Sequence, residues 1–148
     1  MKKMVASLAM LSGFVMVSGS LFAHHGTGAA YEMHKTIVVK GVITEFDYVN
    51  PHSQLYFDVT DDKGNVVHWS TEMTNPFNFQ ALGHNRKELM EKFVPGTIVT
   101  VTGSPSKNGT PNMLFGKAVV ADGWCLCNGS RGGAQLPQNA PPDDNAAK

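Results

Sequence analysis

Hydrophobic and polar residues alternate along the middle of the chain with a period of two, which is typical of β-strands. The clearest alternation covers residues 53–60, where every second residue from Leu55 onward is apolar and the residues between carry polar side chains. Residues 61–65 form a polar turn sequence that contains glycine, and residues 66–73 then alternate again. Two alternating runs joined by such a turn predict a β-hairpin.

Three further stretches rich in β-branched residues predict strands on either side of this hairpin. They cover residues 36–46, 97–103 and 113–121. The first of them is apolar on both parities, as expected for a strand that bends around a small barrel, and Gly41 is the natural place for the bend. The Asn50-Pro51 pair ends this strand.

One stretch, residues 85–93, has the features of a helix. Asn85 is a suitable N-cap and Glu88 follows three residues later, which is the spacing of a capping box. Its apolar side is predicted to consist of Leu89, Met90 and Phe93. Asn75-Pro76 is predicted only to interrupt the chain between the third strand and this helix.

The order of the predicted elements is three strands, one helix and two strands, which is the order of an OB-fold. We therefore expect a mainly β protein, a small five-stranded OB-like barrel with one short helix between strands 3 and 4. A β-sandwich and an open β-roll are the alternatives. No internal repeat is visible, and no linker divides the chain into two globular domains.

The two ends of the chain differ from the middle. Two lysines precede an uncharged apolar run at residues 4–17, and Ala23 is a small residue suited to cleavage, so the first 23 residues read as a secretory signal. The run is shorter than the roughly 20 residues that span a bilayer. The last 20 positions are rich in Gly and Pro and have too few large apolar residues to fold. The expected organisation is a signal peptide at 1–23, a histidine-containing leader at 24–35, an OB-like barrel domain at 36–128 and a disordered tail at 129–148.

Charge and histidine content narrow the candidate functions. Lys and Arg balance Asp and Glu, for a formal net charge of zero, so a nucleic-acid partner is not expected. Export would bring the chain to a bacterial periplasm or to the exterior, where disulfides persist. No membrane span is expected after signal cleavage.

The first candidate site is the predicted mature N-terminus, at His24 and His25. An N-terminal histidine offers its α-amino group and imidazole together, and these donors suit Cu(II), Ni(II) or Zn(II). Cleavage before Ala23 would instead place His24 second and His25 third, which suits square-planar Cu(II) or Ni(II). The alternative is a frayed and solvated chain end.

The second candidate site is the polar face of the hairpin. If the turn pairs Thr60 with Val66, Asp58 lies opposite His68. The second and third strands carry the ligand face in OB-folds. The alternative is an ordinary solvated face with a cross-strand charge pair. The patch contains the metal candidates His52 and His68 and the ligand-binding candidates Gln54, Tyr56, Asp58, Ser70 and Glu72.

The two candidate sites could form one metal centre, because the leader is long enough to reach across a small barrel. The four histidines would then hold Cu(II) or Zn(II). His34 is a weaker member, and His84, beside the helix cap, is expected on the surface. The proposed ligands are His24, His25, His52 and His68.

A third candidate is the Cys125-Leu126-Cys127 segment. An intramolecular disulfide closes a small ring here, and it is expected to lock the end of the fifth strand. Pairing between chains and free thiols that bind Cu(I) or Zn are the alternatives.

Several of these motifs, taken in order, resemble a known family. They are His24-His25, Asn50-Pro51-His52, Trp69 with Glu72 before Asn75-Pro76, the run at 95–103 and Asn108-Gly109. The chain resembles an uncharacterised bacterial family of small exported proteins, a domain of unknown function. The resemblance covers about residues 24–122 and implies an exported OB-like barrel, but it implies no activity.

These observations favour an exported, non-enzymatic binding protein that binds copper through the N-terminal and hairpin histidines. The alternative is a metal-free OB-like adaptor for a peptide, a glycan or an envelope protein. A copper oxidase built on an N-terminal histidine is the enzymatic alternative, but hydrolase, metalloprotease, P-loop and haem motifs are missing from the sequence. No cofactor other than Cu(II) or Zn(II) is suggested.

Overall fold

The computed structural model describes residues 27–127, so the predicted signal peptide, His24, His25 and the C-terminal tail lie outside the described residues. The described residues fall into two units. The first contains the short helix α2 (Thr27–Ala30), and the second, from Tyr31 onward, contains the barrel. Tyr31 is buried and forms a β-bridge with Ser106, so the folded unit begins earlier than residue 36.

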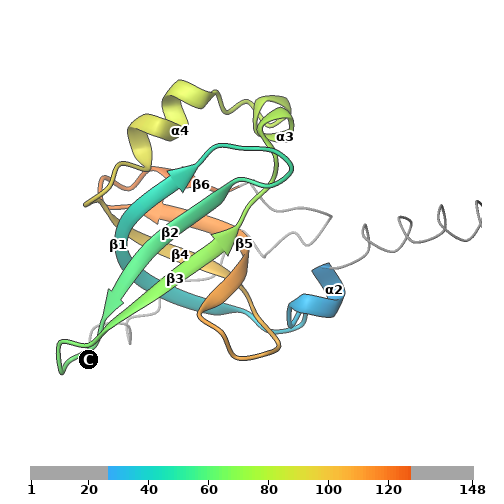
Figure 1. The fold of residues 1–148 in the computed structure, drawn as a ribbon. Helices are drawn as coiled ribbons and strands as arrows, with labels where there is room; N and C mark the ends of the chain where they lie inside the picture. Colours follow the sequence, from blue (N-terminus) through green and yellow to red (C-terminus); the bar gives the residue numbers. More distant parts are fainter. Residues whose placement is uncertain (1–26, 128–148) are drawn as a thin grey trace, which may run out of the picture. The chain divides into compact units, whose positions relative to one another are not determined.

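The strands of the second unit form one sheet in the order β3-β2-β1-β4-β5-β6 (Figure 1). A parallel pairing of β3 with β5 closes the first five strands into a barrel, which confirms the predicted OB-like fold. β6 was not predicted because two residues are too short to show periodicity. The strands are β1 (Ile37–Asp47), β2 (Gln54–Thr60), β3 (Val66–Glu72), β4 (Ile98–Pro105), β5 (Asn112–Val120) and β6 (Cys125–Leu126).

The β2–β3 hairpin has the predicted register. Thr60 lies opposite Val66, and Asp58 lies opposite His68. Phe57 of β2 is fully buried, so a slip of one residue would move it to the solvent side. The apolar alternation therefore determines which side chains form the outer face.

β1 serves both halves of the barrel by pairing first with β4 and then with β2. The register with β2 shifts between Ile43 and Glu45, and this bulge lets Ile43 and Phe46 both face the core although their parities differ. Gly41 permits a close approach of β2, because an added Cβ would lie 2.5 Å from the carbonyl oxygen of Asp58. The bend predicted at Gly41 thus combines a close contact at Gly41 with a bulge two residues later.

The predicted helix is present as α4 (Arg86–Lys92), and the side chain of Asn85 caps it by accepting a hydrogen bond from the Glu88 amide at 2.9 Å. Leu89 and Phe93 are buried as expected. Met90 was wrongly placed on the apolar side, since its side chain is 42% exposed. On a helix this short, only one narrow stripe faces the barrel.

A second helix, α3 (Pro76–Ala81), precedes α4 and was not predicted. The side chain of Asn75 accepts a hydrogen bond from the Asn78 amide at 2.8 Å, and Pro76 occupies the first turn, where its missing N–H costs nothing. Asn75-Pro76 therefore starts a helix rather than only interrupting the chain. Phe79 is its single buried residue.

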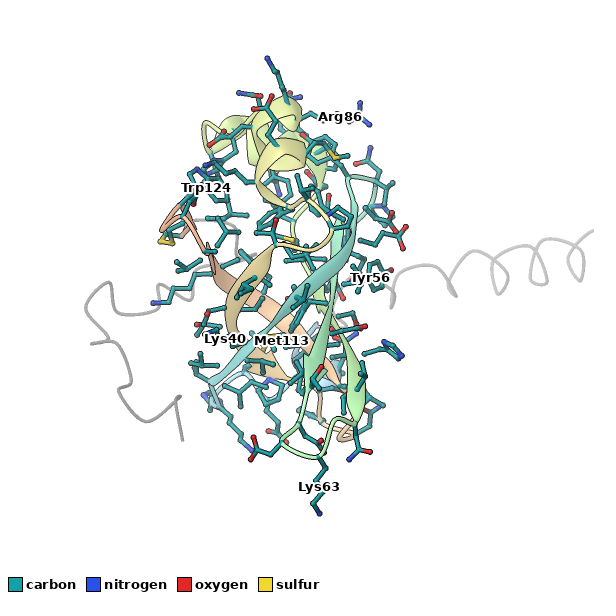
Figure 2. All side chains as sticks on the ribbon, turned by 90° about the vertical axis from the view of Figure 1, so that its left-hand side faces the viewer. Lys40, Tyr56, Lys63, Arg86, Met113 and Trp124 are labelled. Atoms are coloured by element: carbon teal, nitrogen blue, oxygen red, sulfur yellow. A yellow bond between two sulfur atoms is a disulfide. The ribbon has the colours of Figure 1, made fainter. Side chains whose placement is uncertain are left out.

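Both helices lie at one end of the barrel, and the β2–β3 turn lies at the other (Figure 1). Figure 2 shows the same separation through Arg86 at the helical end and Lys63 in the turn. Phe79, Leu89 and Phe93 join the barrel core at the helical end. Within residues 27–127 no helix is both long and apolar enough to cross a membrane.

Candidate functional site

A groove crosses the outer face of β1, β2 and β3. Its volume is about 410 Å³, which falls in the lower part of the usual range for small-molecule sites. The predicted outer face therefore includes a concave surface. The groove is lined by Thr44, Glu45, Tyr56, Asp58, His68, Trp69 and Ser70.

An acid–histidine pair lies in the groove. Nδ1 of His68 is 2.6 Å from Oδ1 of Asp58, as the cross-strand register places them. The His68 side chain is 83% exposed, so this pair adds little to stability. The contact orients the imidazole, and His68 makes no other hydrogen bond within residues 27–127. Its second ring nitrogen is thus available to a ligand.

Tyr56 and Trp69 both line the groove, but strand alternation directs their side chains to opposite faces of the hairpin, because Trp69 lies opposite the buried Phe57. Trp69 is half-buried, and its ring stacks on Phe57 with centroids 6.4 Å apart and an interplanar angle of 18°. Tyr56 lies on the flank of the barrel between the helical end and the turn (Figure 2). Burial, followed by the charges of Asp47 and Glu45, raises the pKa of Tyr56, so its hydroxyl remains a donor at neutral pH.

A hydrogen-bonded network adjoins the groove through Ser70. Glu72 pairs through one carboxylate oxygen with Nδ1 of His52. Its other oxygen accepts from the Tyr31 hydroxyl at 3.1 Å, and that hydroxyl is also 3.0 Å from Oδ1 of Asn112. The Asn112 side-chain amide donates to Oγ of Ser70 at 3.0 Å. The network therefore fixes Ser70 in the groove wall.

Burial and the negative charge of Glu72 raise the pKa of Tyr31 well above its ordinary value. The Tyr31 hydroxyl consequently stays protonated and donates to Glu72. His52 and Glu72 are only 25% and 18% exposed and already bind one another. We therefore interpret them as positioning residues rather than as direct ligand contacts. Gln54 lies opposite Glu72 on β2 and does not line the groove.

The structure does not bring the two hairpin histidines together. His52 pairs with Glu72, while His68 lies four residues away on β3, so their positions differ by about 13 Å along the strand. No group of three His, Cys, Asp or Glu side chains in the described part of the chain is arranged to hold a metal ion. His34 is exposed, and His24 and His25 lie outside the described residues. The four-histidine hypothesis therefore lacks the convergence of His52 and His68 that it requires.

His84 was expected on the surface, but its side chain is only 17% exposed. Its ring packs edge-on against Trp124 with centroids 6.0 Å apart, and its Nδ1 is 3.5 Å from Oε1 of Glu88. The same Glu88 oxygen accepts from Nε1 of Trp124 at 3.2 Å. His84 therefore belongs to a contact between the helical end and the segment before β6, because the unpredicted strand β6 brings Trp124 there.

Sequence reasoning missed Tyr31 and Asn112 because both lie outside the hairpin. The available signal for Tyr31 was its residue type and its place just before a strand. A tyrosine ring can be buried while its hydroxyl forms a hydrogen bond. Trp69 was not among the predicted site residues, and it lines the groove although its ring stacks on the buried Phe57. No signal pointed to Glu45, because the β-bulge redirects it.

The Cys125–Cys127 disulfide is present, with Cα atoms 5.3 Å apart. It lies at β6 and far along the chain from the hairpin residues. It bridges two positions of one segment and does not tie β6 to β5.

The closed strand order and the grooved hairpin face define a small OB-like barrel protein. The chain belongs to a protein family of unknown function, DUF6152, which matches residues 13–133. This match confirms the resemblance to an uncharacterised family. No curated protein matches the chain.

Proposed function

We propose that the protein is an exported, non-enzymatic binding protein that holds a hydroxyl-rich ligand, such as a short glycan, in the groove of β1, β2 and β3. The observation that carries this proposal is the composition of the groove. Its wall combines the aromatic residue Tyr56 with the polar residues Asp58, His68 and Ser70. Aromatic faces bind the apolar faces of sugar rings, and carboxylates accept hydrogen bonds from hydroxyl groups.

The position of the groove also supports binding. Strands 2 and 3 form the ligand face of OB-folds, and they supply most of the groove lining here. The lining is preformed, because the network behind Ser70 and the Asp58–His68 contact hold it without a ligand. Preformed sites lose less entropy on binding. Export is proposed from the signal-like segment at residues 1–23.

This proposal favours the metal-free alternative over copper binding at the hairpin. A metal site needs several donors around one point, and His52, His68 and His84 are each paired with a different carboxylate. Metal binding by His24 and His25 stays a prediction of the sequence.

The test is titration with short neutral oligosaccharides, namely tetramers of N-acetylglucosamine, glucose and mannose. We expect at least one of them to shift the backbone amide resonances of β2 and β3. Tyr56→Ala should weaken that binding by at least about tenfold, which corresponds to about 1.4 kcal/mol. Phe77→Ala is the matched control, because Phe77 is an aromatic residue of α3 that is 75% exposed and lies outside the groove.

The proposal fails if none of the oligosaccharides perturbs these strands. It also fails if Phe77→Ala weakens binding as much as Tyr56→Ala does. Perturbation of β2 and β3 by an extended peptide alone would instead favour the adaptor alternative.

A further inference from the structure

The disulfide between Cys125 and Cys127 lies within one short segment at the edge of the sheet. Leu126 alone separates the two cysteines. Figure 2 shows the disulfide at the molecular surface beside Trp124. Cys127 is exposed and Cys125 is partly buried, so the two sulfurs belong to residues that differ in access to solvent.

This disulfide does little to brace the fold. Cross-links stabilise mainly by restricting the unfolded chain, and the effect is smallest for the shortest loops. The ring closed here contains three residues, and the bond joins no two strands or helices. Stability alone therefore gives no physical reason for a cysteine pair at this place.

β6 is held in place by contacts other than the disulfide. Leu126 is fully buried and pairs with Ala118, and Cys125 pairs with Val119. Before the strand, the carbonyl of Trp124 accepts from the Val120 amide at 3.0 Å. These contacts do not involve the sulfur atoms, so the segment keeps its place when the disulfide is broken. The two thiols then remain close enough to form the bond again.

We propose that Cys125 and Cys127 form a redox-active pair that oxidises dithiols by thiol–disulfide exchange. A thiolate of the dithiol attacks Sγ of Cys127, the more exposed residue of the pair, and the Cys125 sulfur leaves as a thiolate that takes up a proton. The second thiol of the dithiol then attacks the mixed disulfide and releases the Cys127 thiol. The dithiol loses two electrons and two protons and becomes a disulfide, while the pair becomes two thiols.

The experiment mixes the oxidised full chain with a reduced peptide that carries a Cys-x-x-Cys dithiol, and follows both by mass spectrometry after acid quenching. We expect one peptide disulfide to form for each protein disulfide lost. Far-UV circular dichroism and the amide resonances of Leu126 should stay the same in the reduced protein. Loss of the β6 resonances on reduction would show a structural disulfide and overturn the proposal.

Two matched variants test which of the two sulfurs is more accessible to exchange. Cys125→Ser keeps the thiol of the exposed residue Cys127, and Cys127→Ser keeps the thiol of the partly buried residue Cys125. With a peptide disulfide as the probe, Cys125→Ser should form the mixed disulfide at least about tenfold faster than Cys127→Ser, because access controls exchange. Equal rates would overturn the assignment of Cys127. Failure of the peptide dithiol to reduce a disulfide that a phosphine reduces readily would overturn the redox role itself.

Discussion

The hydroxyl of Tyr31 donates a hydrogen bond to Oε2 of Glu72 at 3.1 Å, although the two residues are 41 positions apart in the chain. Glu72 also binds His52 through its other oxygen. The start of the barrel unit is thus attached to the end of β3 at the residue that orients His52. Buried networks of this kind specify one arrangement when every member is satisfied.

Tyr31→Phe should destabilise the protein by about 1–2 kcal/mol. The substitution removes the Tyr31 hydroxyl, so Oε2 of Glu72 and Oδ1 of Asn112 lose their hydrogen-bond donor. The raised pKa of Tyr31 also implies a pH effect. The contribution of the Tyr31 hydroxyl to the stability of the folded protein is fully present below the ordinary pKa of tyrosine. It is lost as the pH rises from that value through the higher folded-state pKa. Chemical denaturation at neutral and at alkaline pH measures both effects.

Tyr56→Phe is the control for this variant, since the Tyr56 hydroxyl makes no hydrogen bond within residues 27–127. We expect its unfolding free energy to stay close to that of the wild type at neutral pH. A Tyr31→Phe variant that lost no more stability than Tyr56→Phe would contradict the importance of the network.

Gly103→Ala should be severely destabilising, by more than about 2 kcal/mol, because an added methyl group collides with backbone that cannot move away. The Cβ would overlap the carbonyl oxygen of Leu114 on β5 and lie 3.1 Å from the sulfur of Met113. Gly28→Ala is the control, as its added Cβ meets no atom within 4 Å. Urea unfolding of both variants provides the comparison, and equal midpoints would show that β4 and β5 can separate at Gly103.

Asp61→Ala should lower the melting temperature by loosening the β2–β3 turn. Hydrogen bonds from the side chain and amide of Asn65 hold the pKa of Asp61 below its ordinary value. The stabilisation of the turn by the Asp61 carboxylate is present above the ordinary pKa of aspartate. It disappears as the pH falls through the lower pKa that Asp61 has in the folded protein. The difference in melting temperature between variant and wild type should therefore shrink in acid.

Asp62→Ala is the matched control for the turn. Asp62 is the exposed neighbour of Asp61, and its side chain makes no hydrogen bond in the described part of the chain. Its replacement should leave the melting temperature almost unchanged at both pH values. A loss as large as that of Asp61→Ala would point to general charge effects instead of the turn.

The predicted leader can be tested by native mass spectrometry of the protein purified from its host, before and after addition of Cu(II) and then a chelator. We expect a chain that begins at Ala23 or His24. Because His52 and His68 do not converge, His52→Ala and His68→Ala should leave any retained Cu(II) in place. Loss of one tightly bound Cu(II) in both variants would contradict the geometry and restore the four-histidine site.

The amino-acid sequence by itself determined the hairpin and its register. Clean alternation around Phe57 and a short turn leave one pairing that buries the apolar residues, so Asp58 opposite His68 followed directly. The cap of α4 was equally local, since Asn85 and the amide of Glu88 are close in sequence. The OB-like fold could also be predicted, because the prediction needs only the order of strands and helices along the chain.

The tertiary structure alone decided which polar residues from distant parts of the chain meet. Tyr31 and Asn112 join Glu72 because β3 pairs with β5 when the barrel closes, and no local pattern encodes that pairing. The groove includes Glu45 because a bulge in β1 shifts the register. His84 becomes buried because β6 brings Trp124 against it. Local periodicity specifies the face of each strand, whereas contacts between distant strands depend on how the whole sheet curves and closes.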